Sequence, residues 1–174
     1  CILIASCALT VSDCTSSQQP EFQRESKMNY SDFVRNQCFI DGAWCDADEG
    51  GTISVTDPAT GETITTVPQM GAAETARAIA AAEAALPAWR AKTAGERAKI
   101  LRKLFDLMIA NQDALGELLS REQGKPLAEA KGEIAYSASF IEWFAEEGKR
   151  AYGEVIPGHA PDRRIVTLRQ PIGV

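Results

Sequence analysis

Residues 126–150 constrain the fold most, because their pattern predicts one long helix with apolar side chains on two of its sides. The first stripe recurs at helical spacing and consists of Ala130, Ile134, Ala138, Ile141 and Ala145. The second stripe is aromatic, at positions i, i+4 and i+7, and consists of Tyr136, Phe140 and Trp143. Such a helix needs packing partners around it, and we expect more protein than these residues provide. The aromatic stripe either packs in a core or forms the wall of a pocket, and from spacing alone we predict that it packs in a core.

Three shorter helices are predicted before this one. The Ala-rich segment 71–86 should end at Pro87, where the ring removes a backbone donor. A capping box at residues 93–96 starts the next helix, whose single apolar stripe comprises Leu101, Leu104, Phe105 and Met108. A third helix is predicted to be capped by Asp113 and to end near Gly124, and its apolar residues are Leu115, Leu118 and Leu119.

Two β-hairpins are predicted before the helices. Residues 38–44 read as a tight hairpin, because an Asp-Gly pair at 41–42 tolerates the positive φ that such turns need. Residues 52–56 and 63–67 are rich in β-branched side chains and flank a turn that contains Pro and Gly. Residues 164–169 alternate like a further strand. The expected fold class is therefore α/β, and it reads as incomplete in this chain.

The charge pattern excludes one class of partner. Eighteen Lys and Arg against twenty-four Asp and Glu give a net charge of −6, and the basic residues are spread through the helices. Nucleic acid is therefore not an expected partner. The apolar stretch at residues 2–11 is too short to span a membrane, so no membrane partner is expected either.

All five cysteines lie within the first 45 residues: Cys1, Cys7, Cys14, Cys38 and Cys45. Their odd number, and their absence from the rest of the chain, favour a reducing compartment over a disulfide scaffold, so we expect a cytoplasmic protein. Residues 1–27 are expected to lie outside the domain, as translated sequence upstream of a start at Met28 or as a truncated leader that ends at Cys14. The domain is then expected to cover residues 28–174.

No short motif in the chain carries chemistry on its own, since phosphate-binding, metal-binding and nucleophile-elbow patterns are all missing. Cys38 invites a nucleophile interpretation, but a buried or edge cysteine explains it better. Lys125 could meet an anion, but a turn between two helices explains every one of residues 122–126 and is the preferred interpretation. A solvated side of the long helix is the simplest interpretation of three acidic residues, Glu142, Glu146 and Glu147.

Five sequence blocks follow one another in order: F-I-D-G-A-W at 39–44, D-P-A-T-G-E at 57–62, L-P-A-W-R at 86–90, E-Q-G-K-P-L at 122–127 and F-I-E-W-F-A-E-E-G-K-R at 140–150. In this order they resemble the aldehyde dehydrogenase superfamily, over about residues 38–174. The last two blocks look most like the NAD(P)-dependent succinate-semialdehyde branch, with glutarate semialdehyde as the close alternative substrate. The resemblance implies the N-terminal part of that fold, in which β-hairpins precede a helical cluster of the Rossmann-like cofactor domain.

The resemblance also implies a mechanism. A cysteine thiolate attacks the aldehyde, hydride passes to NAD or NADP, and a Glu-activated water hydrolyses the thioester. In the family, the P-W-N-F-P, G-S-x-x-x-G, E-L-G-G and G-Q-x-C segments that carry this chemistry come after the position of Val174. The resemblance therefore assigns no catalytic or cofactor-binding residue to this chain, which is expected to be inactive alone.

Three expectations reach residues that are present. Tyr136 and Trp143 match aromatic positions that line the aldehyde tunnel in relatives, and Phe140 lies between them. Glu122, with a backbone carbonyl near Thr56, matches a site for a structural monovalent cation. Residues 155–170 match a hairpin used in subunit assembly, which implies a homotetramer or a dimer for the complete enzyme.

A different class of function stays open. The chain could be a non-catalytic, truncated helical module that binds a partner through an exposed apolar stripe. Continuation of the reading frame into P-W-N-F-P and the later segments would favour the enzyme over this module.

Overall fold

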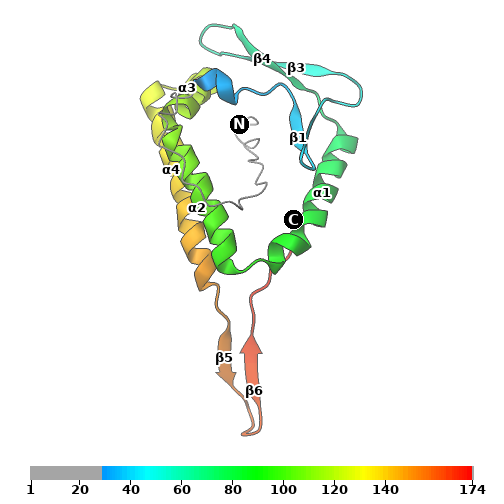
Figure 1. The fold of residues 1–174 in the computed structure, drawn as a ribbon, viewed down its shortest axis with the longest axis vertical. Helices are drawn as coiled ribbons and strands as arrows, with labels where there is room; N and C mark the ends of the chain where they lie inside the picture. The colour runs from blue at the N-terminus through cyan, green and yellow to red at the C-terminus, as the bar shows by residue number, and fades with distance from the viewer. Residues whose placement is uncertain (1–28, 174) are drawn as a thin grey trace, which may run out of the picture.

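The computed structural model describes residues 29–173, in which three antiparallel hairpins and four α-helices are arranged as Figure 1 shows. In chain order the elements are η2 (Tyr30–Phe33), β1 (Cys38–Ile40), β2 (Ala43–Cys45), β3 (Thr52–Thr56), β4 (Thr63–Pro68), α1 (Ala72–Ala91), α2 (Ala94–Ala110), α3 (Gln112–Gln123), α4 (Leu127–Glu147), η3 (Gly148–Arg150), β5 (Glu154–Pro157) and β6 (Arg164–Thr167). Two hairpins followed by a helical cluster confirm the expected α/β arrangement. The predictions for residues 1–27 lie outside the described residues.

Helices α2, α3 and α4 pack against one another and hold the core of the described part. Its centre consists of Leu119 on α3 with Ala130 and Ile134 on α4, and Leu115 packs against this group. Ala130 and Ala138 have no exposed surface, and Ile134 is 2% exposed. The predicted apolar stripe of the fourth helix is therefore buried at Ala130, Ile134, Ala138 and Ala145 and half-buried at Ile141, and its small residues let the neighbouring helices approach closely.

Helices α3 and α4 approach each other closely at Gly116. A Cβ atom at this position would lie 2.6 Å from Cγ of Lys131 and 3.1 Å from its Cα. Two polar contacts flank the crossing: Gln112 Nε2 donates to the Lys131 carbonyl oxygen at 2.9 Å, and Lys131 Nζ lies 2.8 Å from Asp113 Oδ1. Only a residue without a side chain fits between the two helices at this separation.

Helix α1 packs against β1 and is anchored at its first turn by Glu74. One carboxylate oxygen of Glu74 accepts the Asp48 N–H at 3.0 Å, and the other accepts the Gly71 N–H at 2.9 Å. These bonds hold the pKa of the Glu74 carboxyl below its usual value, although the side chain is buried. Arg77, one turn later, forms a two-pronged ion pair with Asp48, its shorter contact being 2.6 Å. The loop after β2 is thereby tied to the start of α1.

The first hairpin turns through Asp41 and Gly42, both at positive φ (52° and 80°), as the Asp-Gly signal predicts. Its strands pair Cys38 with Cys45, Phe39 with Trp44 and Ile40 with Ala43. The Phe39 and Trp44 rings meet edge to face with centroids 5.2 Å apart.

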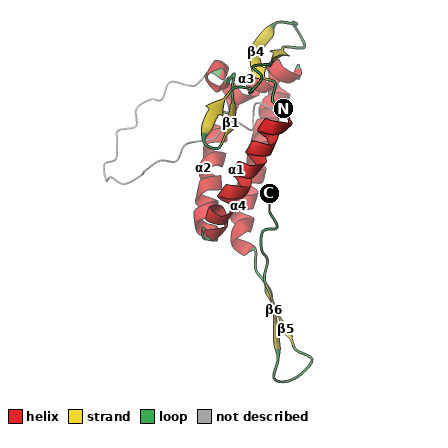
Figure 2. Ribbon diagram, turned by 90° about the vertical axis from the view of Figure 1, so that its right-hand side faces the viewer, coloured by secondary structure: helices red, strands yellow, loops and turns green. Residues whose placement is uncertain are grey.

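The second hairpin pairs β3 with β4, and the register shifts between Val55 and Thr56. The third hairpin pairs β5 with β6. Every residue of its two strands is exposed, and Figure 2 shows that it extends away from the helices.

Two predicted helix boundaries are wrong. Helix α1 does not end at Pro87 but continues to Ala91. Pro87 cannot donate a hydrogen bond to the carbonyl oxygen of Glu83, four residues earlier, but Glu83 is exposed and water can solvate that oxygen. Asp113 does not cap α3, since the helix already begins at Gln112, and Asp113 lies in its first turn. The Thr93 cap of α2 and the left-handed Gly124 (φ 73°) after α3 are both confirmed.

Across residues 29–173, no helix combines the length and the apolar character needed to cross a bilayer.

Candidate functional site

The two faces of α4 meet different surroundings. The small-residue face is buried against α2 and α3, whereas the aromatic side chains on the opposite side are 46–65% exposed: Tyr136, Phe140, Trp143 and Phe144. The prediction from spacing that the aromatic stripe packs in a core is wrong for the described residues. Both neighbouring helices lie on the small-residue side, so no described element buries the rings.

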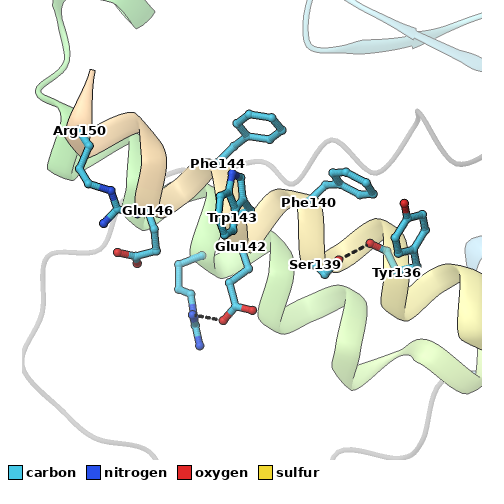
Figure 3. A pocket seen from close by; sticks show the side chains of 9 residues that line it. Tyr136, Ser139, Phe140, Glu142, Trp143, Phe144, Glu146 and Arg150 are labelled. Carbon is cyan, nitrogen blue, oxygen red and sulfur yellow. Dashed lines mark hydrogen bonds and ion pairs between the residues drawn. The ribbon is translucent and has the colours of Figure 1, made fainter. Parts of the chain in front are cut away.

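A cleft of about 820 Å³ runs along this exposed side and onto α2. Figure 3 shows Tyr136, Phe140 and Phe144 in a row on α4. The residues that line the cleft are Arg102, Tyr136, Ser139, Phe140, Glu142, Trp143, Phe144, Glu146 and Arg150. The structure therefore brings all three predicted tunnel residues, Tyr136, Phe140 and Trp143, to one surface.

The rings at the start of the row are held in a defined arrangement. Tyr136 and Phe140 meet edge to face, with centroids 4.8 Å apart and planes at 77°. Ser139 Oγ donates to the Tyr136 carbonyl oxygen at 2.7 Å, a local bond within the helix that occupies its hydroxyl proton. The aromatic wall is thus built by residues of one helix.

The charged side chains of the cleft are paired. Arg102 of α2 reaches Glu142 at 2.7 Å and also Asp106 at 3.4 Å, and its guanidinium lies over the Phe105 ring. At the other end, Arg150 pairs with Glu147, and Lys149 pairs with Glu146 at 3.2 Å. Because the charges compensate one another, apolar ring surface is what the cleft offers to a ligand.

The described lining of the cleft is mainly aromatic ring surface with paired charges. Among residues 29–173, no cysteine or histidine lines the cleft, and the one serine described there is bonded to the backbone. His159, the only histidine of the sequence, lies in the turn between β5 and β6. The arrangement can hold the apolar part of a small molecule, and within the described part of the chain no nucleophile with a base beside it lines the cleft.

Sequence reasoning missed two of the main cleft residues. Phe144 lies one turn after Phe140, so a wider reading of the aromatic stripe would have included it. Arg102 comes from α2, and only the packing of α2 against α4 places it in the cleft.

The segments of Glu122 and Thr56, the predicted cation site, lie next to each other. The loop after β3 meets the end of α3, where a Cβ on Gly124 would lie 2.8 Å from Pro58 Cγ. Glu122 Oε1 is buried and has no hydrogen-bond partner among residues 29–173, and burial raises the pKa of this carboxyl. Residues 29–173 contain no cluster of three or more His, Cys, Asp and Glu side chains suited to a metal ion. A monovalent-cation site formed by the Glu122 carboxylate and a backbone carbonyl near Thr56 therefore stays a prediction.

Three further candidates find structural roles. Cys38 is half-buried on the edge of the first hairpin, as predicted. Lys125 pairs with Glu133, which supports the helix-to-helix turn over an anion site. The solvated interpretation of the acidic residues is confirmed, since the side chains of Glu142, Glu146 and Glu147 are 38–49% exposed, and each also pairs with a basic residue.

Known proteins resemble the chain over most of its length. The model of the aldehyde dehydrogenase family matches residues 44–174. A glutarate-semialdehyde dehydrogenase of Pseudomonas aeruginosa is 69% identical over 140 residues, which cover 80% of this chain and 29% of the relative. The NADP(+) succinate-semialdehyde dehydrogenase GabD of Escherichia coli is 61% identical over 148 residues, which cover 85% of this chain and 31% of the relative.

Solved structures agree in fold. A succinate-semialdehyde dehydrogenase from Burkholderia pseudomallei superimposes with a TM-score of 0.79 at 63% identity, covering 80% of this chain and 29% of that one. The chain thus spans less than a third of the length of these relatives.

Proposed function

The chain belongs to the aldehyde dehydrogenase family, and from this premise we propose that the complete protein oxidises an aldehyde to a carboxylic acid. A nicotinamide cofactor, NAD or NADP, would accept the hydride that this oxidation releases. The observation that carries the proposal is the family match over residues 44–174, together with a described fold that superimposes on solved enzymes of this kind.

The proposed substrate is a semialdehyde with a distal carboxylate. The E-Q-G-K-P-L and F-I-E-W-F-A-E-E-G-K-R blocks favour succinate semialdehyde, whereas the 69% identity to the Pseudomonas aeruginosa enzyme favours glutarate semialdehyde. The two differ by one methylene, which a binding pocket distinguishes by only about 1–3 kcal/mol. We therefore take succinate semialdehyde as the first substrate to assay and glutarate semialdehyde as the second.

In this proposal the aromatic cleft of α4 contacts the aliphatic part of the substrate. Tyr136, Phe140 and Trp143 present ring surface at one side of the cleft, and the paired charges leave that surface free of uncompensated polarity. The chain holds no dinucleotide-binding glycine turn, so none of its residues is assigned to the cofactor. In this proposal the present chain helps to position the substrate, and it would not catalyse the oxidation by itself.

The assay that tests the proposal measures kcat/KM of the complete protein for succinate semialdehyde, glutarate semialdehyde and butyraldehyde, with NAD and with NADP. A site built to pair with a carboxylate should favour both semialdehydes over butyraldehyde by at least about 100-fold. A kcat/KM for butyraldehyde equal to the values for the semialdehydes would contradict recognition of a distal carboxylate. No oxidation of any aldehyde would contradict the proposed enzyme activity.

We also propose that Glu122 and a backbone carbonyl near Thr56 hold a monovalent cation. Glu122 Oε1 supports this: it is buried with no hydrogen-bond partner in the described part of the chain, and a cation would offset the desolvation that raises the pKa of the carboxyl. Thermal unfolding in K⁺ or Na⁺ should then occur at higher temperature than in N-methylglucamine at equal ionic strength, and Glu122→Gln should abolish the difference. An unchanged difference in this variant would contradict the site.

The β5–β6 hairpin is our proposed assembly segment. Val155, Val166 and Leu168 are 61–74% exposed, and isolated edge strands of this kind invite pairing with another chain. We propose that the complete protein is a homotetramer or a dimer. We also propose that it works in the reducing environment of the cytoplasm. Sedimentation of a Val166→Glu variant of the complete protein should show a smaller species than the wild type, and an unchanged species would contradict the assignment.

The exposed aromatic face also favours a second candidate, a non-catalytic module that binds a partner through this surface. The kinetic assay separates the two, since only the enzyme turns over an aldehyde.

A further inference from the structure

The two described cysteines of the chain stand directly opposite each other on the first hairpin. Cys38 begins β1 and Cys45 ends β2, and the register pairs them across the ladder. Successive side chains of a strand alternate between faces, so two opposite residues project to the same side of the hairpin. Phe39 and Trp44 meet on the other side. The two thiols therefore share one face at the open end of the hairpin.

The spacing of opposite residues suits a covalent bridge. Opposite Cα atoms in an antiparallel pair lie about 4.5–5.5 Å apart, and disulfides occur at about 4.4–6.8 Å. Cys45 Sγ already lies 3.4 Å from the Cys38 carbonyl oxygen, to which the thiol donates, so this side chain is turned toward the facing strand. Both cysteines are free thiols. Rotation of side chains, with little movement of the backbone, can bring the sulfurs together.

One of the two thiols is reachable from outside. Cys45 lines a cleft of about 520 Å³ between the hairpin and α1, whose other walls include Ile40, Asp41 and Arg77. Cys38 does not line it, and the pKa of its thiol is raised by burial and by the nearby Cys45. A small reagent in the cleft thus meets Cys45 first.

We propose that Cys38 and Cys45 form a dithiol site, at which a small-molecule disulfide such as glutathione disulfide closes a bridge across the hairpin. Cys45 thiolate attacks the reagent, forms a mixed disulfide and releases one thiolate. Cys38 thiolate then attacks the Cys45 sulfur, forms the Cys38–Cys45 bond and releases the second thiolate. The protein loses two electrons and two protons, and the reagent gains them as two thiols.

The bridge would staple the end of the hairpin that leads to Asp48, the residue that anchors α1 through Glu74 and Arg77. The site is separate from the aromatic cleft, because no described residue lines both. It is also independent of the proposed aldehyde chemistry, so its test needs no activity.

Peptide mapping tests the site in the folded protein. After incubation with glutathione disulfide and quenching by alkylation, trypsin should release residues 36–77 as one peptide, because no Lys or Arg lies between Arg35 and Arg77. This peptide holds both cysteines, and Cys1, Cys7 and Cys14 lie in a different peptide. A closed bridge lowers its mass by about 2 Da and blocks alkylation until a reductant is added.

Matched serine variants assign the roles of the two thiols. Cys38→Ser should stop at a mixed disulfide between Cys45 and glutathione, because the resolving thiol is gone. Cys45→Ser should take up glutathione at Cys38 at least about fivefold more slowly, since Cys38 does not line the cleft.

The ratio of bridged to glutathione-bound peptide should also be at least about tenfold higher in the folded protein than in urea, because the register raises the effective concentration of the second thiol. Two alkylated thiols in the treated wild type, glutathione adducts that never close, or an equal ratio in urea would overturn the proposal.

Discussion

The two faces of α4 share one helix but differ in what covers them. One face carries Ala130, Ile134 and Ala138, which are almost fully buried against α2 and α3. The other carries Tyr136, Phe140 and Trp143, which are large, apolar and about half exposed or more. Residue size alone would predict the reverse, since aromatic side chains gain most from burial. The difference teaches that small residues mark the helix contact, whereas the exposed rings mark a surface available to another molecule.

The largest expected effect is on the buried face. Ile134→Ala should lower the free energy of unfolding by about 2–5 kcal/mol, because it leaves a cavity beside Leu119 and Ala130. Ile79→Ala is the matched control, since Ile79 lies on α1 and is 56% exposed; its effect should stay within about 0.5 kcal/mol. Urea unfolding measures both, and equal losses would break the distinction between buried and exposed positions.

Gly116→Ala tests how closely the buried face is packed. The new Cβ would meet Lys131 backbone atoms at 3.1 Å, so we expect a loss of about 1–3 kcal/mol in spite of the higher helix propensity of Ala. Gly132→Ala, on α4 with no heavy atom within 4 Å of its Cβ, should instead be neutral or stabilising by up to about 1 kcal/mol. Thermal unfolding of both variants would contradict close packing if Gly116→Ala were also stabilising.

Trp143→Ala tests the exposed face. Because the ring is 60% exposed, its loss should change the free energy of unfolding by no more than about 0.5 kcal/mol. A loss above about 2 kcal/mol in urea unfolding of this chain would show that the ring supports the fold, and the two faces would no longer differ.

The contrast between buried and exposed positions extends to carboxylates. The pKa of Glu74 is held down by the N–H groups of Asp48 and Gly71, so its stabilising effect is fully present above the unfolded pKa and is lost as pH falls through the folded one. The stability difference between wild type and Glu74→Gln should therefore shrink as the pH is lowered from about 6 to below 4. If this stability difference stayed constant over the range, the charge of the Glu74 carboxylate would not contribute to the contact with Asp48 and Gly71.

The smallest effect is expected at Arg102 and Glu142, an ion pair that joins α2 to α4 with half-exposed side chains. A double-mutant cycle with Arg102→Ala and Glu142→Ala should give a coupling of about 0.5 kcal/mol or less, falling as salt rises. A coupling free energy above about 2 kcal/mol would contradict this prediction, because only a buried ion pair is expected to contribute that much.

Local signals predicted much of the fold. Asp41-Gly42, the Thr93 capping box and Gly124 each act through the conformation of one or two residues, and the structure confirms them. Pro87 misled the prediction because the cost of a proline in a helix depends on whether the freed carbonyl reaches water, and the sequence does not show solvent exposure.

The candidate site was predictable only in part. Spacing identified Tyr136, Phe140 and Trp143 as one stripe, but periodicity cannot say which of two apolar faces will meet neighbouring helices. The contribution of Arg102 depends on how α2 crosses α4, a tertiary fact with no local signal. The family resemblance, which rests on sequence blocks and not on packing, was needed to give the aromatic stripe a proposed role.

The most direct test of the account compares Trp143→Ala with Trp89→Ala in the complete protein, by kcat/KM for succinate semialdehyde. Trp89 lies on α1, is 38% exposed and does not line the aromatic cleft. If the exposed face of α4 contacts substrate, Trp143→Ala should lower kcat/KM by about tenfold or more, and Trp89→Ala should leave it within about twofold. Equal values for the two variants would contradict the proposed role of the cleft.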